Sequence, residues 1–131
     1  MEKSKTLDRS IQGQILVVDD DKEARRFLME FLRCIGFSDI ATAGSGKEAL
    51  RQLEKNSPRL ILLDYKLPDL DGSEILRRIK QKYPALPVIM MTAYPNAAGM
   101  EKIVEQGAFD LVVKPLDLRY LEQTVVTGFM S

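Results

Sequence analysis

Four short apolar runs of this chain each end at a polar residue that could bind a cation or an anion. Three acids follow the first run, one acid follows the second, and a hydroxyl and a lysine follow the other two: Asp19, Asp20, Asp21, Asp64, Thr92 and Lys114. If the runs are parallel strands of one sheet, these side chains meet at the edge where open α/β sheets bind ligands. Because neighbouring carboxylates resist ionising together, such a cluster requires a cation. The sequence therefore predicts an acidic pocket for a hard divalent metal, with a lysine and a hydroxyl placed for an anion.

Asp64 is the best candidate for a nucleophile in this pocket. A carboxylate can attack a phosphoryl group and form an acyl phosphate, provided that Mg²⁺ (or Mn²⁺) neutralises the incoming charge. Lys114 would stabilise the phosphoryl oxygens as a point charge, and the Thr92 hydroxyl would donate a hydrogen bond to one of them. Pro115, which follows Lys114, is a candidate for a cis peptide bond. Taken singly, each acid could instead be a solvated helix cap or strand end, but their convergence on one edge argues against that interpretation.

The apolar runs alternate with stretches of helical periodicity. We expect strands at Ile15–Asp19, Ser38–Ala43, Arg59–Leu63, Val88–Met91 and Phe109–Val113. We expect helices at Lys22–Ile35 after an Asp21 cap, from a capping box at Ser45 to Lys55, at Ser73–Lys82, at Asn96–Gln106, and from an Asp117 cap to about Thr127. This alternation predicts an α/β fold: a five-stranded parallel sheet in the order 2-1-3-4-5, with helices on both faces. The acids then end the two strands that flank the switch point of the sheet.

Side-chain burial follows from the same periodicity. In the first helix, an apolar stripe is expected to face the sheet: Ala24, Phe27, Leu28, Phe31, Leu32 and Ile35. Cys34 fits this rhythm and is expected to be a small buried residue rather than a reactive thiol. Three residues are expected on the inward side of the fourth helix: Met100, Ile103 and Val104. Asp69 and Asp71 are expected to form turns rather than to bind a metal.

The composition limits the class of protein. The 131 residues suit one domain, which we expect at 14–128 behind a flexible leader at 1–13. Lys plus Arg and Asp plus Glu both number 19, which gives no electrostatic case for binding nucleic acid or an anionic membrane. No apolar run approaches the ~20 residues needed to span a bilayer. The absence of histidine excludes a histidine-based triad and a histidine-ligated zinc, and the single cysteine, with no signal segment, favours the cytoplasm.

Four motifs link this pocket to a known family. ILVVDDD, LDYKLPDLDG, MMTAY and VVKPL occur in this order and spacing, and residues 14–127 thereby resemble the receiver domain of bacterial two-component response regulators. The resemblance implies a flavodoxin-like fold in which Asp64 takes a phosphoryl group from the phosphohistidine of a sensor kinase or phosphotransfer protein. The implied metal ligands are Asp19, Asp20, Asp64 and the backbone carbonyl of Lys66. The implied phosphoryl contacts are Thr92, Lys114 and the backbone of Ala93, and phosphorylation is expected to shift the face built from the fourth helix, fifth strand and fifth helix.

The chain departs from the family pattern at the switch position. Leu111 stands three residues before the lysine, where the family usually has an aromatic residue, and Phe109 is expected on the same face of the strand. Lys66 and Tyr94 lie near the phosphoryl site in sequence, and they are either ordinary loop residues or groups that slow dephosphorylation. Two other functions stay open: a phosphate-independent interaction domain of the same fold, and an aspartyl-phosphate phosphatase or phosphotransferase. The sequence identifies no cognate kinase, output domain or target, and it leaves open a dimer formed on phosphorylation.

Overall fold

The computed structural model describes residues 12–93 and 96–131, so the predicted leader at 1–13 lies almost wholly outside the described residues. Five strands form one sheet: β1 (Ile15–Val18), β2 (Ile40–Ala43), β3 (Leu60–Asp64), β4 (Val88–Thr92) and β5 (Asp110–Val113). They are all parallel and lie in the order β2-β1-β3-β4-β5. The predicted α/β fold and strand order are therefore confirmed.

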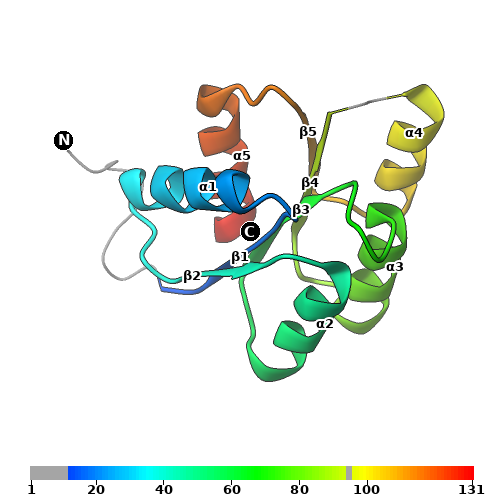
Figure 1. Ribbon diagram of the computed structural model, residues 1–131, viewed down its shortest axis with the longest axis horizontal. Helices are drawn as coiled ribbons and strands as arrows, with labels where there is room; N and C mark the ends of the chain where they lie inside the picture. The colour runs from blue at the N-terminus through cyan, green and yellow to red at the C-terminus, as the bar shows by residue number, and fades with distance from the viewer. Residues whose placement is uncertain (1–11, 94–95) are drawn as a thin grey trace.

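Five helices cover the two faces of this sheet (Figure 1). They are α1 (Lys22–Cys34), α2 (Gly46–Lys55), α3 (Gly72–Lys82), α4 (Ala97–Glu105) and α5 (Leu118–Met130). The buried side chains of α1 and α5 join one core cluster, and those of α2, α3 and α4 join the other. None of the described helices is both long enough and apolar enough to cross a bilayer.

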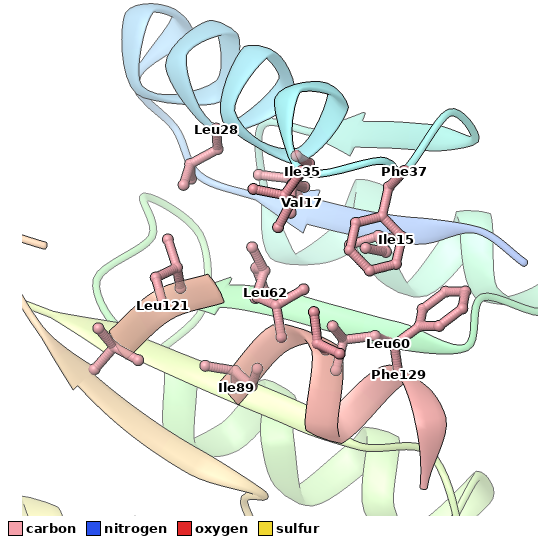
Figure 2. Packing of buried hydrophobic residues seen from close by; sticks show 14 of the residues in the cluster. Ile15, Val17, Leu28, Ile35, Phe37, Leu60, Leu62, Ile89, Leu121 and Phe129 are labelled. Carbon is pink, nitrogen blue, oxygen red and sulfur yellow. The ribbon is translucent and has the colours of Figure 1, made fainter. Parts of the chain in front are cut away.

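The three central strands are buried on both faces, which explains their continuous apolar sequence. Every residue of β1, β3 and β4 is buried, and alternate residues of each strand point to opposite cores. Ile15, Leu60 and Ile89 meet α1 and α5, and Phe129 of α5 contacts Phe37 edge-on with ring centroids 4.8 Å apart (Figure 2). This two-sided packing holds the carboxyl ends of β1 and β3 side by side.

Side-chain caps begin the helices where the sequence predicts them. The Asp21 carboxylate accepts from the backbone N–H of Glu23, the Ser45 hydroxyl accepts from that of Glu48, and Asp117 caps α5. Each cap satisfies a backbone donor that has no partner within the helix. As a result, α1 begins directly after the acidic residues that end β1.

Two predicted core positions of α1 are wrong. Phe27 is 48% exposed and Cys34 is exposed, whereas Leu28 and Leu32 are buried. At 3.6 residues per turn, Phe27 and Cys34 lie about 100° and 120° round the helix from Leu28, at the margin of the apolar stripe. The buried stripe of α1 is therefore narrower than the apolar stripe in its sequence.

The predicted inward side of α4 is also largely wrong. Ile103 is 2% exposed and belongs to the core, but Met100 is 37% exposed and Val104 is 67% exposed. The helix lies beside α3 and β5 at the edge of the sheet. Among the residues of α4 whose burial is described, Ile103 alone is buried against the sheet, and Met100 and Val104 face solvent.

Helix α5 extends three residues beyond the predicted end at Thr127, to Met130. Phe129 is 1% exposed, and the Arg59 guanidinium lies 4.6 Å from the centre of its ring. Burial of this aromatic side chain outweighs the poor helix propensity of the preceding β-branched residues.

Phe109 packs over Gly128 of α5, since its ring lies 3.3 Å from the place where a Cβ of Gly128 would be. It therefore does not share the face of Leu111, which packs against the opposite core.

Candidate functional site

Three carboxylates converge where β1 and β3 end. Asp19 and Asp20 follow β1, and Asp64 is the last residue of β3, the strand that pairs with β1 in parallel register. One oxygen of each carboxylate lies within 4.8 Å of the other two. Asp19 and Asp64 are buried, and Asp20 is exposed. The structure thus brings together the acids that the sequence predicted for one pocket.

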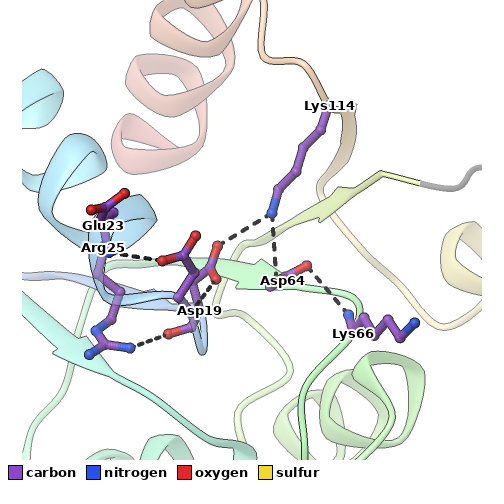
Figure 3. A network of polar contacts seen from close by, with 7 residues as sticks. Asp19, Glu23, Arg25, Asp64, Lys66 and Lys114 are labelled. Atoms are coloured by element: carbon purple, nitrogen blue, oxygen red, sulfur yellow. Dashed lines mark hydrogen bonds and ion pairs between the residues drawn. The ribbon is translucent and has the colours of Figure 1, made fainter.

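Lys114 joins two of these acids from the end of β5. Its Nζ lies 3.4 Å from Asp19 Oδ2 and 3.5 Å from Asp64 Oδ2 (Figure 3). The Lys114–Pro115 peptide bond is cis, and the Lys114 backbone N–H donates to the carbonyl of Thr92 at 2.7 Å. The Lys114 ammonium thus connects the end of β5 to the acids at the ends of β1 and β3.

Burial raises the pKa of Asp64 above its ordinary value of 3.8, and the nearby carboxylate of Asp19 raises it further. Lys114 and the backbone N–H of Lys66, which donates to Asp64 Oδ1 at 3.4 Å, oppose this rise without cancelling it. Without a further cation, the pocket thus disfavours the charged form of Asp64. A bound divalent ion would reverse that preference.

The loop between β3 and α3 closes on itself beside Asp64. The Gly72 N–H donates to the Tyr65 carbonyl at 2.8 Å, and Lys66 and Asp71 form an isolated antiparallel bridge. A Cβ on Gly72 would lie 2.5 Å from the Tyr65 carbonyl oxygen, so only glycine fits this close approach. This closure holds the main chain of Lys66 next to Asp64.

Thr92, Ala93 and Asn96 line the other wall of the site. Thr92 is buried at the end of β4, whereas Ala93 is exposed. Together with Asp64 and Lys114 they line a cavity of about 770 Å³ that is open to solvent. Tyr94, which the sequence leaves as either an ordinary loop residue or a group that slows dephosphorylation, lies outside the described residues.

Two residues at this edge were not recognised from the sequence. Arg25 of α1 donates to the backbone carbonyl of Asp19 at 2.7 Å. Asp69 was expected to form a local turn, but its carboxylate accepts from the backbone N–H groups of Gly46 and Lys47, both at 2.9 Å. It therefore ties the β3–α3 loop to the start of α2, and these bonds lower the pKa of Asp69. Both contacts join residues of different elements, and no local sequence signal indicates them.

The donor set fits a small, hard divalent cation. Oxygen ligands from two or three carboxylates, with open positions on the solvent side, are typical of Mg²⁺ and Mn²⁺ sites. The exposed Asp20 and the open cavity leave room for water and a phosphoryl group. Among the described residues, this is the one group of three or more acidic, histidine or cysteine side chains close enough to hold a metal ion.

Comparison with known proteins gives one consistent family. The model of the response regulator receiver domain matches residues 15–126. The transcriptional regulatory protein ZraR of Escherichia coli (strain K12) is 39% identical over 111 residues, which cover 85% of this chain and 25% of ZraR. The DNA-binding transcriptional regulator NtrC of the same organism is 38% identical over 107 residues, which cover 82% of this chain and 23% of NtrC. The chain thus spans about a quarter of the length of these relatives.

Solved structures of receiver domains superpose over most of the chain. A response regulator receiver domain protein from Clostridium thermocellum matches with a TM-score of 0.84 and 29% identity, covering 91% of this chain and 95% of that one. A putative response regulator from Chloroflexus aurantiacus matches with a TM-score of 0.84 and 32% identity, covering 91% and 98%. The sheet order and the flanking helices described above are therefore those of a known flavodoxin-like fold.

Proposed function

Since this chain belongs to the response regulator receiver domain family, we propose that it is a phosphoacceptor switch in which Asp64 takes a phosphoryl group. The observation that supports this most strongly is the arrangement of Asp64 between two acids and one lysine at the carboxyl edge of the sheet. In the proposed step, the bond from phosphorus to a partner's histidine nitrogen breaks and a bond from phosphorus to an Asp64 oxygen forms. The electron pair of the broken bond stays on the imidazole.

The residues of the pocket have separate tasks in this proposal. Asp19, Asp20, Asp64 and the carbonyl of Lys66 would hold Mg²⁺ or Mn²⁺, which when bound neutralises charge on the phosphoryl oxygens. Lys114 would move from the two carboxylates to a phosphoryl oxygen, because the phosphoryl group as a whole carries more negative charge than either acid alone. The Thr92 hydroxyl and the Ala93 backbone would donate to the remaining oxygens.

The partners in this proposal follow from the chemistry of the pocket. The proposed donor is a sensor histidine kinase or a phosphotransfer protein, as the receiver-domain family implies. Its phosphohistidine would lie on that partner, because the sequence contains no histidine. Phosphorylation would shift the surface formed by α4, β5 and α5 toward a form that a target, an output domain or a second copy binds. The proposed domain spans 14–128, and the proposed location is the cytoplasm.

Leu111 is the observation that favours a second candidate, a receiver-fold domain that binds its partner without phosphate. It packs against the core cluster shared by α2, α3 and α4, where an aromatic switch residue would otherwise lie. Leucine has no hydroxyl group and no aromatic ring, and its side chain is smaller than an aromatic one. It therefore offers less contact through which to couple with Thr92. A turnover phosphatase is disfavoured, because Lys66, the residue two positions after Asp64, is basic and cannot act as a second acid.

Intact mass after incubation with acetyl phosphate tests the proposed function. We expect the chain to gain one phosphoryl group in the presence of Mg²⁺, and to gain none with EDTA or after Asp64→Asn. Asp39→Asn, at an exposed position after α1, removes an equivalent charge and should leave the gain intact. A gain that persists in Asp64→Asn would contradict the proposal that Asp64 is the acceptor. No gain under any condition would contradict the proposal and favour the phosphate-independent domain.

The decay of that phosphoryl group decides between the two roles left open for Lys66 and Tyr94, ordinary loop residues or groups that slow dephosphorylation. If Lys66 adds charge beside the acyl phosphate and Tyr94 shields it from water, Lys66→Asn and Tyr94→Ala should each shorten its half-life. A half-life that is unchanged in both variants would identify them as ordinary loop residues.

A further inference from the structure

Arg25 lies behind the acids rather than among them. It is half-buried on the first turns of α1, and its Nη1 donates to the carbonyl oxygen of Asp19 at 2.7 Å (Figure 3). Gly44, after β2, leaves the space that the guanidinium occupies, since a Cβ there would lie 3.2 Å from Nη1. The Gly44 N–H is in turn held by Glu48 Oε2 at 3.1 Å. The Arg25 side chain thus fills a space between α1, the end of β2 and the start of α2.

The Arg25 contact is one of three that fix the main chain at Asp19. The Asp19 N–H donates to the Ala43 carbonyl at 3.1 Å, and the Asp21 N–H donates to Asp19 Oδ1 at 3.0 Å. The first bond extends the β1–β2 ladder, and the second belongs to the turn itself. Arg25 supplies the only one of the three that comes from a side chain of α1. It therefore couples the orientation of the turn to the position of that helix.

We propose that Arg25 is a positioning residue for the divalent cation, a role that rests on the proposed function of this pocket. Its bond to the Asp19 carbonyl sets the peptide plane between Asp19 and Asp20. That plane decides whether the Asp20 carboxylate points toward Asp64, because Asp20 is exposed and its side chain is not enclosed by a core that would orient it. Arg25 touches neither the cation nor the phosphoryl group in this role.

The sign of its effect separates positioning from simple electrostatics. If Arg25 acted only as a nearby positive charge, neutralising it would make the acidic pocket more negative and would tighten cation binding. If it positions the turn, neutralising it weakens binding despite the gain in negative charge. Removal of groups that support metal ligands typically weakens metal affinity by about 10- to 100-fold, so we expect a loss of about tenfold.

Binding of Mn²⁺ to the full chain, followed by the electron paramagnetic resonance signal of free Mn²⁺, tests this inference. We expect Arg25→Gln to bind Mn²⁺ about tenfold more weakly than the unsubstituted chain. Arg25→Lys, which keeps a donor and the charge, should recover most of the affinity. Arg26→Gln is the matched control, because it removes the same charge from the exposed neighbouring position and should change binding little.

Each outcome has one meaning when thermal unfolding of the metal-free variants is measured alongside. Binding by Arg25→Gln that is equal to or tighter than that of the unsubstituted chain would overturn the inference and leave the proposed function standing. A loss that Arg25→Lys fails to restore, in a variant that melts well below the control, would reduce Arg25 to a structural role and would also overturn it. No Mn²⁺ binding by the unsubstituted chain would overturn the proposed function itself.

Discussion

Replacing Asp64, the proposed phosphoacceptor, by its uncharged isostere should stabilise the metal-free protein. Asp64→Asn keeps the shape of the side chain and removes a charge that burial disfavours. It also removes repulsion from Asp19 and Asp20, and it removes attraction to Lys114. The net sign depends on the relative sizes of these effects.

The distances give the size of each Coulomb contribution. At an effective dielectric constant of about 20, two like charges at the limiting separation of 4.8 Å repel by about 3.5 kcal/mol, and the attraction at 3.5 Å is about 4.7 kcal/mol. Two such repulsions exceed the one attraction by about 2 kcal/mol, and the cost of burying the carboxylate acts in the same direction. Solvent around the exposed Asp20 screens its share of the repulsion and reduces this difference. We therefore expect Asp64→Asn to raise the free energy of unfolding by about 1 to 2 kcal/mol at pH 7, or the melting temperature by about 4 °C per kcal/mol.

Urea unfolding followed by circular dichroism, in EDTA and over a range of pH, measures this difference. Because the folded-state pKa of Asp64 is raised, the folded protein holds this proton more tightly than the unfolded chain does. The free energy of unfolding of the unsubstituted protein therefore decreases as the pH rises from 3.8 through the folded-state pKa. The Asp64→Asn variant does not show this decrease, because asparagine does not titrate. The advantage of Asp64→Asn should be complete above that pKa and vanish below pH 3.8. Mg²⁺ at ten times its dissociation constant should add about 1.4 kcal/mol to the unsubstituted chain and less to the variant.

The control for this prediction is Glu54→Gln, which removes one charge from an exposed position on α2 and should change stability by less than about 0.5 kcal/mol. The reasoning is refuted if Asp64→Asn is less stable than the unsubstituted chain at pH 7 in EDTA. It is also refuted if the advantage of the variant grows as the pH is lowered.

Three further substitutions test other contacts at this edge. Lys114→Met should raise the pKa of Asp64 further, because it removes a cation 3.5 Å away, and should tighten Mn²⁺ binding about three- to tenfold in a titration. Gly72→Ala should lower the free energy of unfolding by about 3 kcal/mol in urea, because its Cβ would lie 2.5 Å from the Tyr65 carbonyl oxygen; a gain, as helix propensity alone predicts, would contradict this. Asp69→Ala should lower that free energy by about 1 kcal/mol, or the melting temperature by about 4 °C, because it removes two hydrogen bonds at the start of α2.

Two kinds of feature could be predicted from the sequence: those that follow from the periodic spacing of apolar residues, and those that follow from the position of a polar residue at the end of a strand. The apolar runs and helical stripes predict the strand order, because parallel crossovers allow few arrangements. The placement of Asp19, Asp64 and Lys114 at strand ends predicts that they meet, because parallel strands share one carboxyl edge. Each of these inferences needs only local sequence and a general rule of topology.

The features that could not be predicted depend on how deeply an element packs. Phe27 and Cys34 fit an apolar stripe, but its width depends on the distance from α1 to the sheet, which the sequence of α1 does not contain. The last turn of α5 extends to Met130 because Phe129 contacts Phe37, a partner more than ninety positions earlier. In the same way, the bond from Arg25 to the Asp19 carbonyl depends on an approach between elements rather than on a motif.

The two hydrogen bonds of Asp69 have a spectroscopic consequence. They join the β3–α3 loop, which follows Asp64, to the N–H groups of Gly46 and Lys47, which do not line the acidic cavity. Any movement of the loop on metal binding or phosphorylation changes the length of these bonds, and amide chemical shifts respond strongly to such changes. We therefore expect the amide signals of Gly46 and Lys47 to report occupancy of the pocket from a neighbouring helix, without a probe attached to the site.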